Sequence, residues 1–273
     1  AFVAAGLKKT QGIDLQPLNF GVGGYSTGAE LTTLIEAVRK YPNIRVAVFY
    51  HGANDVGRFV EKLQYGIRDP VYEAMSYPFM PSVSSAVHNS FSGRFSFLGN
   101  WYDEPKPAFP YLWYRLRKAF YTKLIALTGA WDPRDVAMKE PNRSPEAYDR
   151  IARQITDQYA HNVLDIRAVA QRRGIVPVFV LQSLVFHKPN RTQREEAIVE
   201  KLRSRLFDME RLYNLTFENI RNDPRLKAVH LFDLTDVFAE VSEPLYYDFV
   251  HISAAGNQLV SDAIVARIQN LIP

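Results

Sequence analysis

The chain has 273 residues, of which 47% are hydrophobic, and a formal net charge of +4. This length and composition are typical of one large globular domain with a well-buried core. The basic residues are scattered, which gives no indication of a nucleic-acid partner, and the absence of cysteine excludes a disulfide scaffold, a thiolate metal site and a cysteine nucleophile.

Short apolar runs predict four buried parallel strands, at residues 15–22, 45–52, 176–183 and 228–235. Helical patterns occupy residues 1–9, 31–40, 144–173, 192–221 and 254–271. The third of these helices opens with Ser144 and Pro145, a typical N-cap and first turn. Strands that alternate with helices predict an α/β fold with a parallel sheet and right-handed crossovers.

An aromatic-rich stretch at about residues 57–133 interrupts this alternation. It contains Trp101, Trp113 and Trp131, several prolines and no strand pattern. Because a structureless loop of this length is uncommon in a compact domain, we predict a partly helical insertion. Its best helix, residues 111–127, has one apolar and one basic face. We expect a lid helix that packs on the core; a helix that lies on a membrane surface is the alternative.

A glycine-rich turn, Gly21-Val-Gly-Gly24, follows the first predicted strand and precedes a helix. It does not fit a dinucleotide-binding fingerprint, because Ser26 stands where that motif has its third glycine and no acidic residue ends the next strand. The turn is either a simple tight connection or a device that directs the backbone N–H of Gly24 toward a developing oxyanion.

A second polar motif, Gly52-Ala-Asn54-Asp55, lies just after the second predicted strand. Parallel sheets place their ligands at this end of their strands. The Asn54 side chain can donate an amide N–H to an oxyanion, whereas an Asn-Asp turn that only ends the strand is the alternative.

A third motif, Asp248-Phe-Val-His251, precedes the C-terminal helix. Three residues apart at a helix start, the two side chains can meet, with His251 as a general base and Asp248 as the carboxylate that orients it; a cap or a surface polar pair is the alternative. No set of His, Asp and Glu has metal-ligand spacing, so we predict neither a metal nor another cofactor. The candidate substrate-contacting residues, at or beside strand ends, are Tyr25, His51, Ser183 and His187.

In this order and on these elements, the three motifs resemble three of the four sequence blocks of the SGNH (GDSL-type) hydrolases. Residues 174–182, 232–236 and 251–257 agree with the resemblance, which covers the chain apart from the insertion. It implies one domain over residues 1–273 with a three-layer α/β/α, flavodoxin-like parallel sheet. It also implies that the Gly24 N–H and the Asn54 side chain are oxyanion-hole donors, that His251 is the general base and that Asp248 orients it.

The family's serine-bearing block is not found among these residues. The resemblance places that serine in a turn after a first strand, ahead of Asn19, and in the flavodoxin-like order this strand lies between the second and the third. We therefore expect roughly 20 to 40 further residues upstream of Ala1 that carry the strand and the serine, and we expect the chain without them to be inactive. Ser26 and Ser183 are the alternative nucleophiles within the chain.

The resemblance implies a serine ester hydrolase that acts, through an acyl-enzyme, on a small-molecule, carbohydrate or lipid ester. Acyl transfer to a carbohydrate acceptor uses the same groups and is the second interpretation; a non-catalytic relative that binds a glycan, lipid or protein is the third. No apolar run reaches the length of a membrane span, so membrane association has no support in the sequence. The family's habit favours an extracytoplasmic location, which the Asn-x-Ser/Thr sequences at Asn142, Asn190 and Asn214 do not establish.

Overall fold

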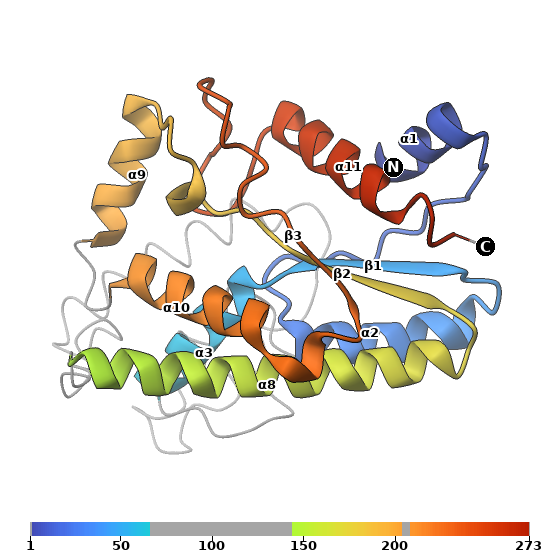
Figure 1. Ribbon diagram of the computed structural model, residues 1–273, viewed down its shortest axis with the longest axis horizontal. Coiled ribbons are helices and arrows are strands. Elements are labelled where there is room, and N and C mark those ends of the chain that lie inside the picture. The colour runs from blue at the N-terminus through green and yellow to red at the C-terminus, as the bar shows by residue number, and fades with distance from the viewer. Residues whose placement is uncertain (1, 66–143, 204–207, 273) are drawn as a thin grey trace, which may run out of the picture. The chain divides into compact units, whose positions relative to one another are not determined.

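The computed structural model describes residues 2–65, 144–203 and 208–272 (Figure 1). The chain divides into two compact units, one formed by residues 1–60 and 142–273 and the other by residues 61–141. Of the second unit, only the end of helix α3 is described. The insertion predicted at about residues 57–133 therefore lies almost entirely outside the described residues, as does its predicted helix at 111–127.

The first unit is built on a three-stranded parallel sheet in the order β1-β2-β3. The strands are Val46–His51, Val176–Leu181 and His230–Asp233. They confirm the predicted strands at 45–52, 176–183 and 228–235, whose runs of β-branched and aromatic residues suit a buried sheet. β2 is the central strand although it contains Pro177. Its pairing with β3 begins only at Val178, so the N–H that proline lacks is not needed for a hydrogen bond of the sheet.

The strand predicted at residues 15–22 is absent. Residues 12–22 form neither a helix nor a strand and pair with no described strand. Three apolar side chains at alternate positions, Leu18, Phe20 and Val22, are 38–41% exposed. The prediction was wrong because alternating apolar residues specify that a segment can pair, whereas a strand also requires a partner along its edge.

Helices lie on both faces of the sheet (Figure 1). One face is covered by α2 (Thr27–Lys40), α8 (Pro145–Gln171) and α10 (Met209–Asn222), and the other by α1 (Phe2–Gln11) and α11 (Ala254–Ile268). The expected mixed α/β class with a parallel sheet is therefore confirmed. No helix in the described part of the chain is long and apolar enough to cross a membrane.

Two helix predictions can be compared closely with the structure. The Ser144 side chain accepts the Ala147 N–H at 3.3 Å, which confirms it as the N-cap of α8. The helix predicted at 192–221 was wrong as a single element, because α9 (Gln193–Arg203) and α10 are separate helices. Asp208 starts α10 anew by accepting the Arg211 N–H at 3.0 Å.

Candidate active site

All three sequence motifs lie toward the carboxyl end of the parallel sheet. Asn54 lies in the first turn of α3 (Ala53–Tyr65), directly after β1, and the Asp248–His251 turn comes after β3. Tyr213 on α10 contacts a residue beside Asn54 and a residue within the Asp248–His251 turn. Its hydroxyl donates to the Ala53 carbonyl oxygen at 3.0 Å, and its ring centroid lies 6.1 Å from that of Phe249. The two motifs therefore share a buried neighbour at one end of the sheet.

The side chains of Asp248 and His251 are in direct contact. Nδ1 of His251 lies 2.7 Å from Oδ2 of Asp248, and Oδ1 accepts the backbone N–H groups of Val250 at 2.9 Å and His251 at 2.8 Å. Partial burial raises the pKa of Asp248, but these hydrogen bonds outweigh it and hold the pKa below its ordinary value. With the carboxylate ionised, Nδ1 carries a proton toward it and Nε2 is left as the basic nitrogen. The His251 side chain is 71% exposed, so a reacting group can reach it.

Backbone pairing holds the turn that carries this pair. Tyr246 and Ile252 form an antiparallel bridge, and the Tyr247 N–H donates to the His251 carbonyl oxygen at 2.8 Å. The Phe249 carbonyl oxygen accepts the Val185 N–H at 3.0 Å, which ties the turn to the segment after β2. The fold therefore sets the position of the imidazole.

Glu195 on α9 anchors the start of the same turn. Its side chain is wholly buried; Oε1 accepts the N–H groups of Leu245 at 2.9 Å and Tyr246 at 3.1 Å, and Oε2 accepts Lys188 Nζ at 2.7 Å. Burial raises the pKa of Glu195, but the bonds from Lys188, Thr192 and the two amides outweigh it and lower the pKa to about 2. Sequence reasoning missed this buried pair, because no local pattern marks a contact between α9 and residues 245–246.

The two candidate oxyanion donors belong to segments that are tied together. Gly24 has a φ of +84°, which favours glycine, and its carbonyl oxygen accepts Arg58 Nε of α3 at 3.1 Å. Asp55 Oδ1 accepts the backbone N–H of Thr27 at 3.1 Å and its hydroxyl at 2.6 Å. The Gly24 turn is thus fixed against the start of α3. Asn54 lies in the first turn of that helix, where the free N–H groups favour negative charge.

His51, a candidate substrate-contacting residue, lies inside the protein. Its Nδ1 is 2.7 Å from Glu30 Oε2, its Nε2 is 2.9 Å from the Tyr159 hydroxyl, and the side chain is buried. Burial lowers the pKa of His51, but Glu30 outweighs it and raises that pKa above its ordinary value. Burial raises the pKa of the nearby Asp55 carboxyl to about 6, although His51 and Thr27 oppose the shift. Because Glu30 and Tyr159 come from separate helices, no motif could have revealed this network.

The remaining candidate contacts differ in their exposure. Ser183 is wholly buried; its hydroxyl donates to the Thr235 carbonyl oxygen at 2.8 Å and lies 3.0 Å from the Tyr246 hydroxyl. His187 is half-buried, and burial, with the charge of Arg221, lowers its pKa to about 4, which leaves the ring neutral at pH 7. Tyr25, by contrast, lines with Asn54 a groove of about 900 Å³ beside β1.

Within the described residues, no group of three or more His, Cys, Asp or Glu side chains could hold a metal ion. Comparison of the chain with protein-family models, with curated proteins and with solved structures returned no match. The resemblance to the SGNH hydrolases therefore depends on the three sequence motifs and is a basis for proposals only.

Proposed function

We propose that this protein is a serine ester hydrolase of flavodoxin-like, SGNH type that works through an acyl-enzyme. The observation that carries the proposal is the Asp248–His251 pair. An ionised carboxylate holds Nδ1 at 2.7 Å, and the imidazole is accessible on a turn fixed by backbone hydrogen bonds. This arrangement suits a general base whose tautomer must be fixed.

In the proposed reaction, Nε2 of His251 takes the proton of a serine hydroxyl as that oxygen attacks the ester carbonyl carbon. The resulting oxyanion accepts hydrogen bonds from the Gly24 N–H and the Asn54 amide, and Asp248 stabilises the imidazolium. The imidazolium then gives its proton to the leaving alkoxide as the carbon–oxygen bond breaks. Water, activated by the same imidazole, attacks the acyl-enzyme and releases the acid.

The nucleophilic serine, in this proposal, belongs to polypeptide upstream of Ala1. Ser183 supports this assignment, because its hydroxyl is buried and hydrogen-bonded to Thr235 and Tyr246. Ser26 is the N-cap of α2 and makes no capping hydrogen bond with its side chain, which makes it the alternative within the chain.

Labelling with a fluorophosphonate probe tests the proposal. The polypeptide encoded by the natural gene is labelled, and the modified peptide is identified by mass spectrometry. We expect one labelled serine upstream of Ala1 and loss of the label in His251→Ala. The exposed His161 provides a matched control, because His161→Ala should leave labelling unchanged. A label on Ser26 would refute the assignment of the nucleophile, and the absence of any label would favour a non-catalytic binding protein.

Product analysis then identifies the acyl acceptor. An ester substrate is incubated with unlabelled enzyme from a preparation that reacts with the probe, with and without a carbohydrate. Release of free acid in both cases supports hydrolysis, whereas an acylated sugar formed at the expense of the acid would show acyl transfer instead.

A further inference from the structure

The most exposed large apolar side chain in the described ranges lies beside the Asp248–His251 pair. It belongs to Tyr247, which is 60% exposed. The Tyr247 N–H donates to the His251 carbonyl oxygen at 2.8 Å, and the adjoining residues Tyr246 and Ile252 form the antiparallel bridge. Because side chains alternate along such a ladder, Tyr247 and His251 project to one face, opposite to the buried Tyr246. The tyrosine ring is therefore a neighbour of the candidate general base.

A cation lies over this ring. The guanidinium carbon of Arg194, on α9, is 5.8 Å from the centroid of the Tyr247 ring, which is within the range of a cation–π contact. The next residue of each segment fixes the pair, because the buried Glu195 carboxylate accepts the Tyr246 N–H at 3.1 Å. Since Arg194 precedes Glu195 and Tyr247 follows Tyr246, the anchor of the turn also holds Arg194 and Tyr247 side by side before any ligand binds.

Arg194 has no anionic partner among the described residues. The two glutamates that follow it are taken by other cations, since Glu195 pairs with Lys188 and Glu196 with Arg191, both at 2.7 Å. A cation in the first turn of a helix is also unfavourable, because the free N–H groups there favour negative charge. The arginine therefore does not stabilise the start of α9, and its exposed guanidinium is available to a carboxylate or a phosphate.

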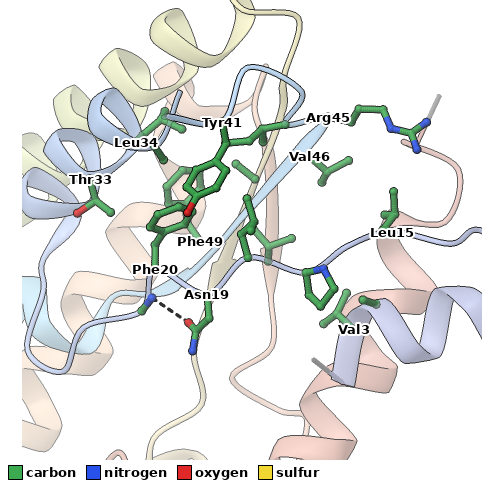
Figure 2. Close-up of a pocket in the computed structure, with 18 of the residues that line it drawn as sticks. Val3, Leu15, Asn19, Phe20, Thr33, Leu34, Tyr41, Arg45, Val46 and Phe49 are labelled. Carbon is green, nitrogen blue, oxygen red and sulfur yellow. Dashed lines mark hydrogen bonds between the residues drawn. The ribbon is translucent and has the colours of Figure 1, made fainter. Parts of the chain in front are cut away.

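The Tyr247 ring forms no ring pair within the described part of the chain. A second cation–aromatic pair differs in this respect: Lys40 Nζ is 5.4 Å from the centroid of Tyr41, and the Tyr41 ring packs on Phe20 with centroids 5.7 Å apart (Figure 2). An exposed ring face attracts the C–H groups on the flat face of a sugar, because its π electrons carry partial negative charge. A hydrocarbon ligand would stay in contact with water at such an open site and would gain less.

We propose that Tyr247 and Arg194 form a binding site for a sugar that carries an anionic group, either a carboxylate or a phosphate. The sugar ring stacks on the exposed part of the Tyr247 ring, and the guanidinium donates hydrogen bonds to the anion. The assignment of this sugar as the alcohol part of the ester rests on the proposed function, because the imidazolium of His251 delivers its proton to the leaving alkoxide. Binding itself requires no hydrolysis.

Titration by NMR with matched sugars tests the proposal. Glucose and galactose are each used unmodified, as the uronic acid and as the 6-phosphate, so that only the group at carbon 6 changes. We expect the resonances of Tyr247 and of the Arg194 side chain to shift saturably, with a Kd for an acidic sugar at least about tenfold lower than for its neutral counterpart. The uronic acids and the phosphates distinguish a carboxylate ligand from a phosphate ligand. Equal Kd values for acidic and neutral sugars, or no saturable shift with any of them, would overturn the proposal.

Variants separate the contribution of the ring from that of the charge. Tyr247→Phe keeps the ring and should bind as the wild type does, whereas Tyr247→Ala should raise the Kd for the acidic sugar by about tenfold. Arg194→Gln should raise that Kd to the value of the neutral sugar. Lys40→Gln and Tyr41→Ala are matched controls that should leave it unchanged. An unchanged Kd in Tyr247→Ala or Arg194→Gln, or an equal loss in the controls, would contradict the proposed site.

The sugar titration and the fluorophosphonate test fail independently, because that probe carries no sugar. A labelled serine in a protein that binds none of the sugars would refute the binding site and leave the hydrolase proposal in place. Specific binding of an acidic sugar without any labelled serine would refute the hydrolase and support a carbohydrate-binding protein with this site.

Discussion

Replacing Glu195 with glutamine tests whether its carboxylate anchors the turn that carries Asp248 and His251. The wild-type carboxylate is wholly buried and accepts hydrogen bonds from Lys188, Leu245 and Tyr246. Glutamine places an N–H₂ group against one set of these donors and leaves the Lys188 ammonium buried without a counter-charge. Breaking a buried pair in this way costs about 3–5 kcal/mol, so we expect the Glu195→Gln variant to be less stable by that amount at pH 7.

The pH dependence of the difference in unfolding free energy between wild type and Glu195→Gln can be calculated from the pKa of Glu195. The pKa of Glu195 falls from its ordinary value of 4.5 to about 2 on folding. A lowered pKa means that the contribution to stability is fully present above pH 4.5 and is lost as the pH falls toward 2. At 1.36 kcal/mol per pKa unit, the whole contribution is about 3 kcal/mol, of which about 2 kcal/mol is lost by pH 3.

Urea denaturation at pH 7 and pH 3 measures both quantities. The difference in unfolding free energy between wild type and Glu195→Gln should narrow by about 2 kcal/mol at the lower pH. The neighbouring Glu196 pairs with Arg191 at 2.7 Å and is half-exposed, so Glu196→Gln is a matched control that should change little at either pH. A wild-type-to-Glu195→Gln difference that is the same at both pH values would refute the reasoning.

Other variants test the proposed catalytic groups and one backbone position. In the polypeptide encoded by the natural gene, Asn54→Ala should lower kcat for ester hydrolysis by about 10²–10³ if the amide stabilises the oxyanion, and an unchanged kcat would refute that role. Asp248→Asn should lower kcat by about 10⁴ with little change in Tm, because the imidazole loses the acceptor that fixes its tautomer. Gly52→Ala should destabilise the fold by about 1–3 kcal/mol in urea denaturation, since its φ is +113° and the new Cβ would lie 3.0 Å from Phe217; Gly174→Ala, at φ +67° with open space, should cost less.

The sequence was sufficient for those parts of the fold that local chemistry determines. The three strands of the sheet follow from short runs of β-branched and aromatic residues, and the start of α8 follows from the capping preference of Ser144. The break between α9 and α10 was not found, because apolar residues continue at helical spacing on both sides of residues 204–207.

The candidate site was predictable to a similar extent. Asp248 and His251 are three residues apart, so their contact depends on one turn and is visible in the sequence. The contacts of His51 with Glu30 and Tyr159 join three separate elements, and their existence depends on how α2 and α8 pack on β1. The sequence places His51 correctly at a strand end, but a strand end faces either the solvent or a covering helix, and only the packing decides between them.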